Sequence, residues 1–135
     1  MEFRTDVKHT PAQLADVLRR SGLAERRPVD DPECLAGMVR GADLMVTAWE
    51  EGVLVGVARS VTDFVYCCYL SDLAVDRAFQ GRGIGRALIA QTQACLGSRC
   101  SIILLAAPAA VDYYPHIGME AHPSAWVLRP GAPLR

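Results

Sequence analysis

The chain has 135 residues, of which 51% are hydrophobic and 21% are charged. That length fits one domain, residues 1–135, with a core of its own. The apolar fraction excludes a disordered chain. The formal net charge of −1 gives no general attraction to nucleic acid or to anionic membranes, so we expect neither as a partner.

No segment of the sequence predicts a membrane span or a metal site. The longest strongly apolar stretch, Ile102 to Val111, is about half as long as the ~20 residues that a spanning helix needs. The N-terminus lacks the apolar centre of a signal peptide, so we expect a cytoplasmic protein. The five cysteines contain no CxxC pair, which favours buried, reduced thiols. His9 is expected on the surface, without metal-ligand spacing.

The first third of the chain predicts one short strand and two helices. Phe3–Val7 has the character of a strand. Thr10-Pro11 is typical of a helix start, with a polar cap before a proline, and Gly22 is typical of its end. Asp31-Pro32 begins a second helix in the same way, and Gly41 ends it.

The period of the apolar residues then changes to two, which predicts three antiparallel strands. Leu44–Trp49 and Val53–Val61 are joined by Glu50-Glu51-Gly52 as a hairpin. Thr62-Asp63 turns the chain into a third strand, Phe64–Val75, whose length suggests a central position. A helix follows the glycines after this strand, with Ile84, Leu88 and Thr92 on its apolar face.

The last part of the chain predicts two further strands around a short helix. Ser101–Ala107 is expected to be a buried strand because it is almost continuously apolar. Ala110–Ile117 should be helical, and Ser124–Leu128 should be a last strand. The order of elements predicts an α+β (mixed α/β) fold rather than a uniform βαβ repeat.

The most informative segment is a turn with three glycines between a strand and a helix. Glycine lets the backbone bend sharply, and the first N–H groups of a helix lack internal partners and attract negative charge. Such a turn can hold a pyrophosphate, and Arg82 and Arg86 add positive charge beside it. The spacing fits neither a P-loop nor a dinucleotide-binding fingerprint, so another nucleotide-binding fold is the weaker interpretation.

The spacing Gln80-x-x-Gly83-x-Gly85 resembles the acyl-CoA pyrophosphate loop of the GCN5-related N-acetyltransferase (GNAT) superfamily, whose pattern is Q/R-x-x-G-x-G/A. Leu73-Ala74-Val75 resembles the strand that precedes this loop. Tyr113-Tyr114, followed by a glycine and a hydrophobic residue, resembles its last conserved helix. The chain is similar to a small, single-domain, bacterial-type member.

The resemblance implies a GNAT-like fold. This fold has a central, mixed, mostly antiparallel sheet of six to seven strands flanked by about four helices. Two neighbouring parallel strands, Leu70–Val75 and Ser101–Ala107, would splay apart in a V and leave a gap for coenzyme A. Many members carry an asparagine where this chain has Ala107, so one side-chain contact to coenzyme A would be missing or replaced.

The resemblance also implies acetyl-CoA as co-substrate, without a metal. The backbone of Leu73 to Val75 would pair with the pantetheine arm, Gln80 would order the turn, and Arg82 or Arg77 would reach the 3′-phosphate. N–H groups of the loop would hold the pyrophosphate. The full implied set is Leu73, Ala74, Val75, Gln80, Gly81, Arg82, Gly83, Ile84, Gly85 and Arg86.

The implied reaction is direct acetyl transfer to a primary amine. Tyr114 takes the family's general-acid position, because a phenol can protonate the leaving thiolate. Pro115 should shorten or bend its helix and could shift the hydroxyl. A backbone N–H near Val75 could stabilise the oxyanion. Asp72 is the candidate base, unless it only attracts the amine.

The acceptor itself is left open by the sequence. Scattered acidic residues slightly favour a small cationic amine, and a peptide or protein amine is the alternative. Candidates for the acceptor pocket are Tyr69, Tyr66, Asp63 and Arg59. The alternative to an enzyme is a non-catalytic acyl-CoA sensor or scaffold. The resemblance also implies a homodimer, in which Trp49 and Trp126 lie either at the interface or in the core.

Overall fold

A computed structural model describes residues 1–7 and 9–135 of the chain. These residues form one five-stranded sheet in the order β1-β2-β3-β4-β5, with antiparallel pairs except for the parallel pair β4–β5. The strands are β1 (Glu2–Arg4), β2 (Leu44–Glu50), β3 (Val53–Thr62), β4 (Cys67–Val75) and β5 (Ser101–Ile103). The helices are α1 (Pro11–Ser21), α2 (Pro32–Arg40), α3 (Ile84–Ala94) and α4 (Tyr113–His116), with short 3₁₀ turns η1 (Leu23–Arg26), η2 (Arg77–Phe79) and η3 (Pro108–Ala110).

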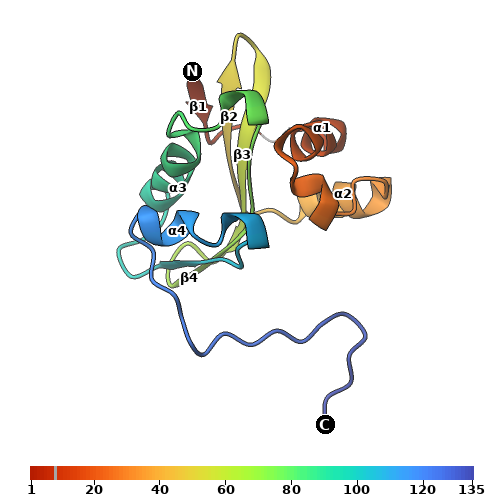
Figure 1. The fold of residues 1–135 in the computed structure, drawn as a ribbon, viewed down its shortest axis with the longest axis vertical. Helices are drawn as coiled ribbons and strands as arrows, with labels where there is room; N and C mark the ends of the chain where they lie inside the picture. The colour runs from red at the N-terminus through yellow and green to blue at the C-terminus, as the bar shows by residue number, and fades with distance from the viewer. Residues whose placement is uncertain (8) are drawn as a thin grey trace.

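The helices cover both faces of the sheet. Figure 1 shows α1 and α2 on one side and α3 with α4 on the other, while the last residues run away from the body. Leu14, Val17 and Leu18 of α1 pack against β3 and β4 in one buried cluster. Ile84 and Leu88 of α3 pack against the opposite face in a second cluster. The mixed α+β fold is therefore confirmed.

The helix boundaries follow the capping residues of the sequence. Thr10 and Gln13 form a capping box at the start of α1, and Gly22 ends the helix with a left-handed φ of 88°. Asp31 accepts a hydrogen bond from the Cys34 N–H at the start of α2. Both predicted helices are confirmed, since each begins at a capping residue and places apolar side chains in the same core cluster.

The end of the sheet differs from the prediction. Six to seven strands were expected, but the described residues form five, and β5 is only three residues long. Ser124–Leu128 is not a strand, because no strand among the described residues pairs with it, and Trp126 is 91% exposed. Ser101–Ala107 is not fully buried either. Ile102 and Leu104 pack against the core beneath α3, whereas Ile103 and Leu105 on the other face are half exposed.

Three smaller predictions are also wrong. The third strand begins at Cys67 rather than at Phe64, because the Asp63 carboxylate accepts the N–H groups of Val65, Tyr66 and Cys67 and holds them in the turn. Only Cys68 is buried among the cysteines, although all five are free thiols. His9 is buried, not on the surface, with 1% of its area exposed.

Among the described residues, no helix is long and apolar enough to cross a bilayer.

Candidate active site

The gap between β4 and β5 is the first feature of the site. The two strands pair only from Cys67–Ser101 to Tyr69–Ile103, and no further pairing follows. Beyond that point the two segments separate, and residues of both line a cavity of about 1040 Å³. The predicted splay between Leu70–Val75 and Ser101–Ala107 is confirmed. It exposes one backbone edge of β4 to a ligand, as an unpaired strand edge does.

An irregularity in β4 lies at the mouth of this gap. Arg59 of β3 faces Asp72, whereas the next residue, Ser60, faces Leu70, so Ser71 is an extra residue on β4. Such a bulge bends a strand and turns the following side chains to the other face. Leu70 accordingly packs beneath α3, while Ala74 packs against α1. The bulge therefore aims Asp72 toward the α1–α2 side of the sheet.

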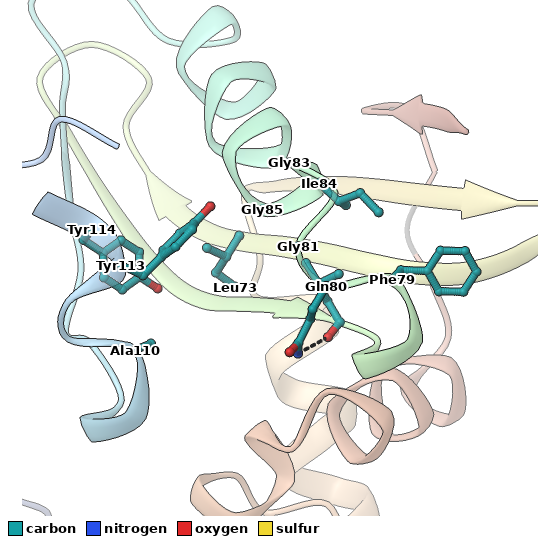
Figure 2. A pocket seen from close by; sticks show the side chains of 11 residues that line it. Leu73, Phe79, Gln80, Gly81, Gly83, Ile84, Gly85, Ala110, Tyr113 and Tyr114 are labelled. Carbon is teal, nitrogen blue, oxygen red and sulfur yellow. Dashed lines mark hydrogen bonds between the residues drawn. The ribbon is translucent and has the colours of Figure 1, made fainter. Parts of the chain in front are cut away.

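The glycine-rich turn forms a second cavity, of about 410 Å³, at the start of α3. Gly81 and Gly83 have φ values of 78° and 77°, a conformation that other residues adopt only under strain. No side chain caps the first turn of α3, and that turn contains no acidic residue. Its N–H groups are therefore left for an anion. Gln80 donates from Nε2 to the carbonyl of Val75 at 2.9 Å (Figure 2), so it ties the turn to β4.

The arginines near the turn take different directions. The guanidinium of Arg82 lies over the Phe79 ring, 5.0 Å from its centre. Arg77 turns away toward the end of α1, where its Nη2 would come within 2.5 Å of a Cβ added to Gly22. Arg82 is consequently better placed than Arg77 to meet an anion at the turn. Arg86 is exposed on the first turn of α3.

Tyr113 and Tyr114 approach the turn from the opposite wall (Figure 2). Their rings meet edge to face, with centres 5.3 Å apart. The hydroxyl of Tyr113 lies against Gly85, 3.0 Å from where a Cβ would be, so Gly85 makes room for it. Tyr114 lines both cavities, and burial raises the pKa of its hydroxyl. Despite Pro115, the short α4 brings Tyr114 to the junction of the two cavities.

Asp72 lies beneath the larger cavity and is completely buried. Its two oxygens accept from Nε of Arg27 and from Nε of Arg59, each at 2.5 Å. Arg27 also donates to the Ser71 carbonyl at 2.6 Å, and Arg59 donates to the Ser71 hydroxyl at 2.9 Å. The bulge and the two guanidinium groups thus form one connected cluster.

The larger cavity contains some of the residues predicted for an acceptor pocket and one that the sequence did not suggest. Arg59 and Tyr69 line the larger cavity. Asp63 and Tyr66 do not, because both belong to the β3–β4 turn. Arg27 was missed, since the segment around it has the composition of an ordinary polar connection. The buried His9 was also missed. Burial lowers the pKa of its imidazole, which favours the neutral form.

Together these features define an α+β protein with an open strand edge that leads to an uncapped helix N-terminus. This arrangement fits an extended ligand with a pyrophosphate group. The backbone edge of β4 can pair with an amide-containing arm, and the turn can receive the anion without a side chain in the way. Among the described residues, no group of three or more His, Cys, Asp or Glu side chains could hold a metal ion.

Comparison with known proteins gives the family. A family model described as an acetyltransferase (GNAT) domain matches residues 14–131, so the chain belongs to the GNAT acetyltransferase family. It is 36% identical over 76 residues, 55% of the chain, to GCN5-related N-acetyltransferase 2, chloroplastic, from Arabidopsis thaliana. A histone acetyltransferase from Glycine max shows the same identity over the same length. These matches cover 30% and 33% of the two relatives, about a third of their length.

Solved structures support the fold. A probable acetyltransferase from Staphylococcus aureus superposes with a TM-score of 0.75 over 95% of this chain and 96% of its own, at 18% identity. An aminoglycoside acetyltransferase from an uncultured soil sample superposes with a TM-score of 0.68 at 21% identity, over 99% of this chain and 96% of its own. At such low identity these structures show the shared fold alone.

Proposed function

We propose that the protein is an acetyl-CoA-dependent N-acetyltransferase that transfers an acetyl group directly to a primary amine, with Tyr114 as general acid. The observation that carries this proposal is the position of Tyr114, which lines both the cavity at the glycine turn and the cavity between the splayed strands. A donor held at the glycine turn would extend its pantetheine arm along β4 into the second cavity, and an amine in the rest of that cavity would meet the thioester at the Tyr114 hydroxyl.

The cofactor-binding residues are proposed from the same geometry. The main chain of Leu73, Ala74 and Val75 would hold the pantetheine arm. The N–H groups at the turn and the first turn of α3 would hold the pyrophosphate, with Gln80 keeping the turn in place. The set is completed by Gly81, Arg82, Gly83, Ile84, Gly85 and Arg86.

Acetyl-CoA, when bound, supplies the acetyl thioester. The amine nitrogen forms a bond to the acetyl carbon, the carbon–sulfur bond breaks, and the sulfur keeps the electron pair. Tyr114 donates its proton to that sulfur, since a tyrosine hydroxyl is protonated at neutral pH and burial raises its pKa further. A β4 N–H near Val75 would stabilise the oxyanion. The proton that the amine releases returns the tyrosine to its neutral form through solvent.

Asp72 fits a positioning role better than the role of base. A general base needs an oxygen within hydrogen-bond reach of the amine. Both oxygens of Asp72 already accept from arginines, and the carboxylate is fully buried. We therefore propose that Asp72 fixes Arg27 and Arg59 at the wall of the larger cavity.

The test is the release of free thiol from acetyl-CoA with a panel of amines. Tyr114→Phe should lower kcat by about 10²–10⁴-fold, the usual contribution of a general acid. Tyr113→Phe is the matched control, because its hydroxyl rests against Gly85 and should affect turnover little. Equal rates for Tyr114→Phe and the parent would remove Tyr114 from the mechanism. Acetyl-CoA binding without thiol release from any amine would favour the sensor or scaffold.

Three further points remain proposals. We infer that residues 1–135 act as one catalytic domain, which limited proteolysis would test. A homodimer is proposed from the family resemblance alone, and light scattering after gel filtration would measure it. We also propose a cytoplasmic location, although one relative is named as chloroplastic, and imaging of a tagged chain would decide it.

A further inference from the structure

The larger cavity is strongly basic, although the chain as a whole has a net charge of −1. Five arginines line it: Arg26, Arg27, Arg59, Arg77 and Arg129. Glu25 is the one acidic side chain among the described residues that line it. The positive charge is thus concentrated in the cavity that the acceptor would share with the pantetheine arm of the donor.

The scattered acidic residues of the sequence favour a cationic acceptor, but in the structure these residues do not line the larger cavity. Asp43, Glu50, Glu51 and Asp63 are absent from the described lining, and Asp72 is buried behind it. Asp72 also contributes no free negative charge, since two guanidinium groups share it. One carboxylate against two guanidinium groups leaves a charge of +1 at the cavity wall. This wall is partly buried, so solvent screens the charge less than it would at the surface.

Arg27 and Arg59 also carry N–H donors that are not used in the described contacts. A guanidinium carries five N–H donors in a planar fork. Arg59 uses three of them, on Asp72, on the Ser71 hydroxyl and on the Met38 carbonyl. Arg27 likewise uses three, on Asp72, on the Ser71 carbonyl and on the Arg26 carbonyl. Within the described contacts, two N–H donors on each arginine are left, and guanidinium donors suit carboxylate or phosphate oxygens.

We infer that the acceptor is a small amine that also carries a carboxylate or phosphate group, which Arg27 and Arg59 bind in the larger cavity. This inference rests on the proposed acetyl transfer. It separates this chain from an enzyme for polyamines or other polycations, which the same charge would repel. The cavity walls also favour the reactive form of the acceptor, because nearby positive charges disfavour an ammonium ion over the neutral amine.

Matched pairs of amines test the inference. Glycine is compared with glycinamide, and O-phosphoethanolamine with ethanolamine, while spermidine is the cationic arm. We expect at least about tenfold higher kcat/KM for the anionic member of one pair, as charge-assisted hydrogen bonds would give. The pair that shows the preference identifies carboxylate or phosphate. Equal rates within both pairs, or faster turnover of spermidine, would overturn the inference.

Variants then connect the preference to the arginines. Arg59→Gln should reduce it to about twofold or less. Arg26→Gln should reduce the preference for the anionic amine partly. This second variant serves if Arg59→Gln does not fold, because the exposed Arg26 side chain forms no ion pair in the described structure. Arg99→Gln is the matched control, an exposed arginine outside both described linings. A preference that survives both cavity variants would overturn the assignment.

A binding measurement separates this inference from the proposed function. N-acetylglycine and N-acetylglycinamide, with the corresponding N-acetylated phosphoethanolamine, are compared by saturation-transfer NMR, which needs no turnover. If no amine releases thiol but an anionic ligand binds and Arg26→Gln weakens it, the proposed reaction fails and the anion site stands. If acetyl-CoA is turned over but no anionic ligand binds more tightly than its neutral partner, the reaction stands and the anion site is refuted.

Discussion

The two cavities share five lining residues, Leu73, Val75, Gln80, Ala110 and Tyr114, but the remaining residues of each come from different kinds of segment. Most of the cavity at the glycine turn is lined by residues of one segment, Phe79 to Gly85 without Arg82, with Leu73 and Val75 beside it and Ala110, Tyr113 and Tyr114 opposite. The larger cavity uses side chains from separate elements. Arg27 follows η1 and Arg59 lies on β3, and both pair with Asp72 of β4, which is buried behind the cavity. A site made of consecutive backbone leaves a spacing in the sequence, whereas a site made of dispersed side chains leaves none.

The largest expected effect is on the arginine cluster, which depends on one carboxylate. Asp72→Asn would leave Arg27 and Arg59 partly buried without their shared counter-ion. Removal of one partner from a buried ion pair costs about 3–5 kcal/mol, so the free energy of unfolding should fall by about that amount in urea titrations. Glu120→Gln is the control, since Glu120 is exposed. A fully stable Asp72→Asn variant that loses turnover would instead restore Asp72 as the base.

The second prediction concerns Tyr114 and uses the pH dependence of kcat. Burial raises the pKa of its hydroxyl, so the protonated form that donates to sulfur persists beyond the ordinary value of about 10. We expect kcat not to fall as the pH rises toward that value, and to fall about tenfold per pH unit only above the raised pKa. Tyr114→Phe should lack this alkaline limb. A fall in kcat that begins well below pH 10 in the parent enzyme would assign the acid to another group.

The elements that the sequence predicted correctly depend on local signals. The capping residues at Thr10 and Asp31, and the spacing at Gln80 and Gly83, each depend on neighbours within a few residues, and the predicted helices and glycine turn were confirmed. The splay was implied by a family resemblance, which carries the topology with it. Ser124–Leu128 failed because a strand needs a partner, and the alternation of its residues does not show whether one exists.

Long-range partners were the other limit. The burial of His9 and the pairing of Arg27 with Asp72 both depend on segments that are far apart in the chain. No periodicity connects such residues, because their contact depends on how α1, η1 and β4 pack. Local chemistry therefore predicted the glycine turn, whereas tertiary packing determines the arginine-lined cavity.

A smaller effect is expected where backbone conformation alone is changed. Gly83→Ala meets no atom within 4 Å, so its cost comes from φ of 77°, about 1–2 kcal/mol. The turn should shift, and acetyl-CoA should bind about tenfold more weakly by calorimetry. Gly52→Ala is a close control, with φ of 78° and equal space, in the β2–β3 turn away from both cavities. It should lose similar stability and keep its affinity. Equal affinity in both variants would mean that the turn does not hold the donor.

The smallest effect tests whether side chains add anything to the backbone site. Phe79→Leu removes the ring beneath Arg82, an exposed cation–π contact of about 0.5–1 kcal/mol, so the affinity for coenzyme A should fall about two- to fivefold. If Arg82 binds the 3′-phosphate, dephospho-coenzyme A should bind the variant and the parent equally well. An equal loss for both ligands would place Arg82 at the pyrophosphate instead. No loss for either ligand would mean that the backbone holds the donor without help from this arginine. The glycine turn would then bind through main-chain groups alone, unlike the arginine-lined cavity.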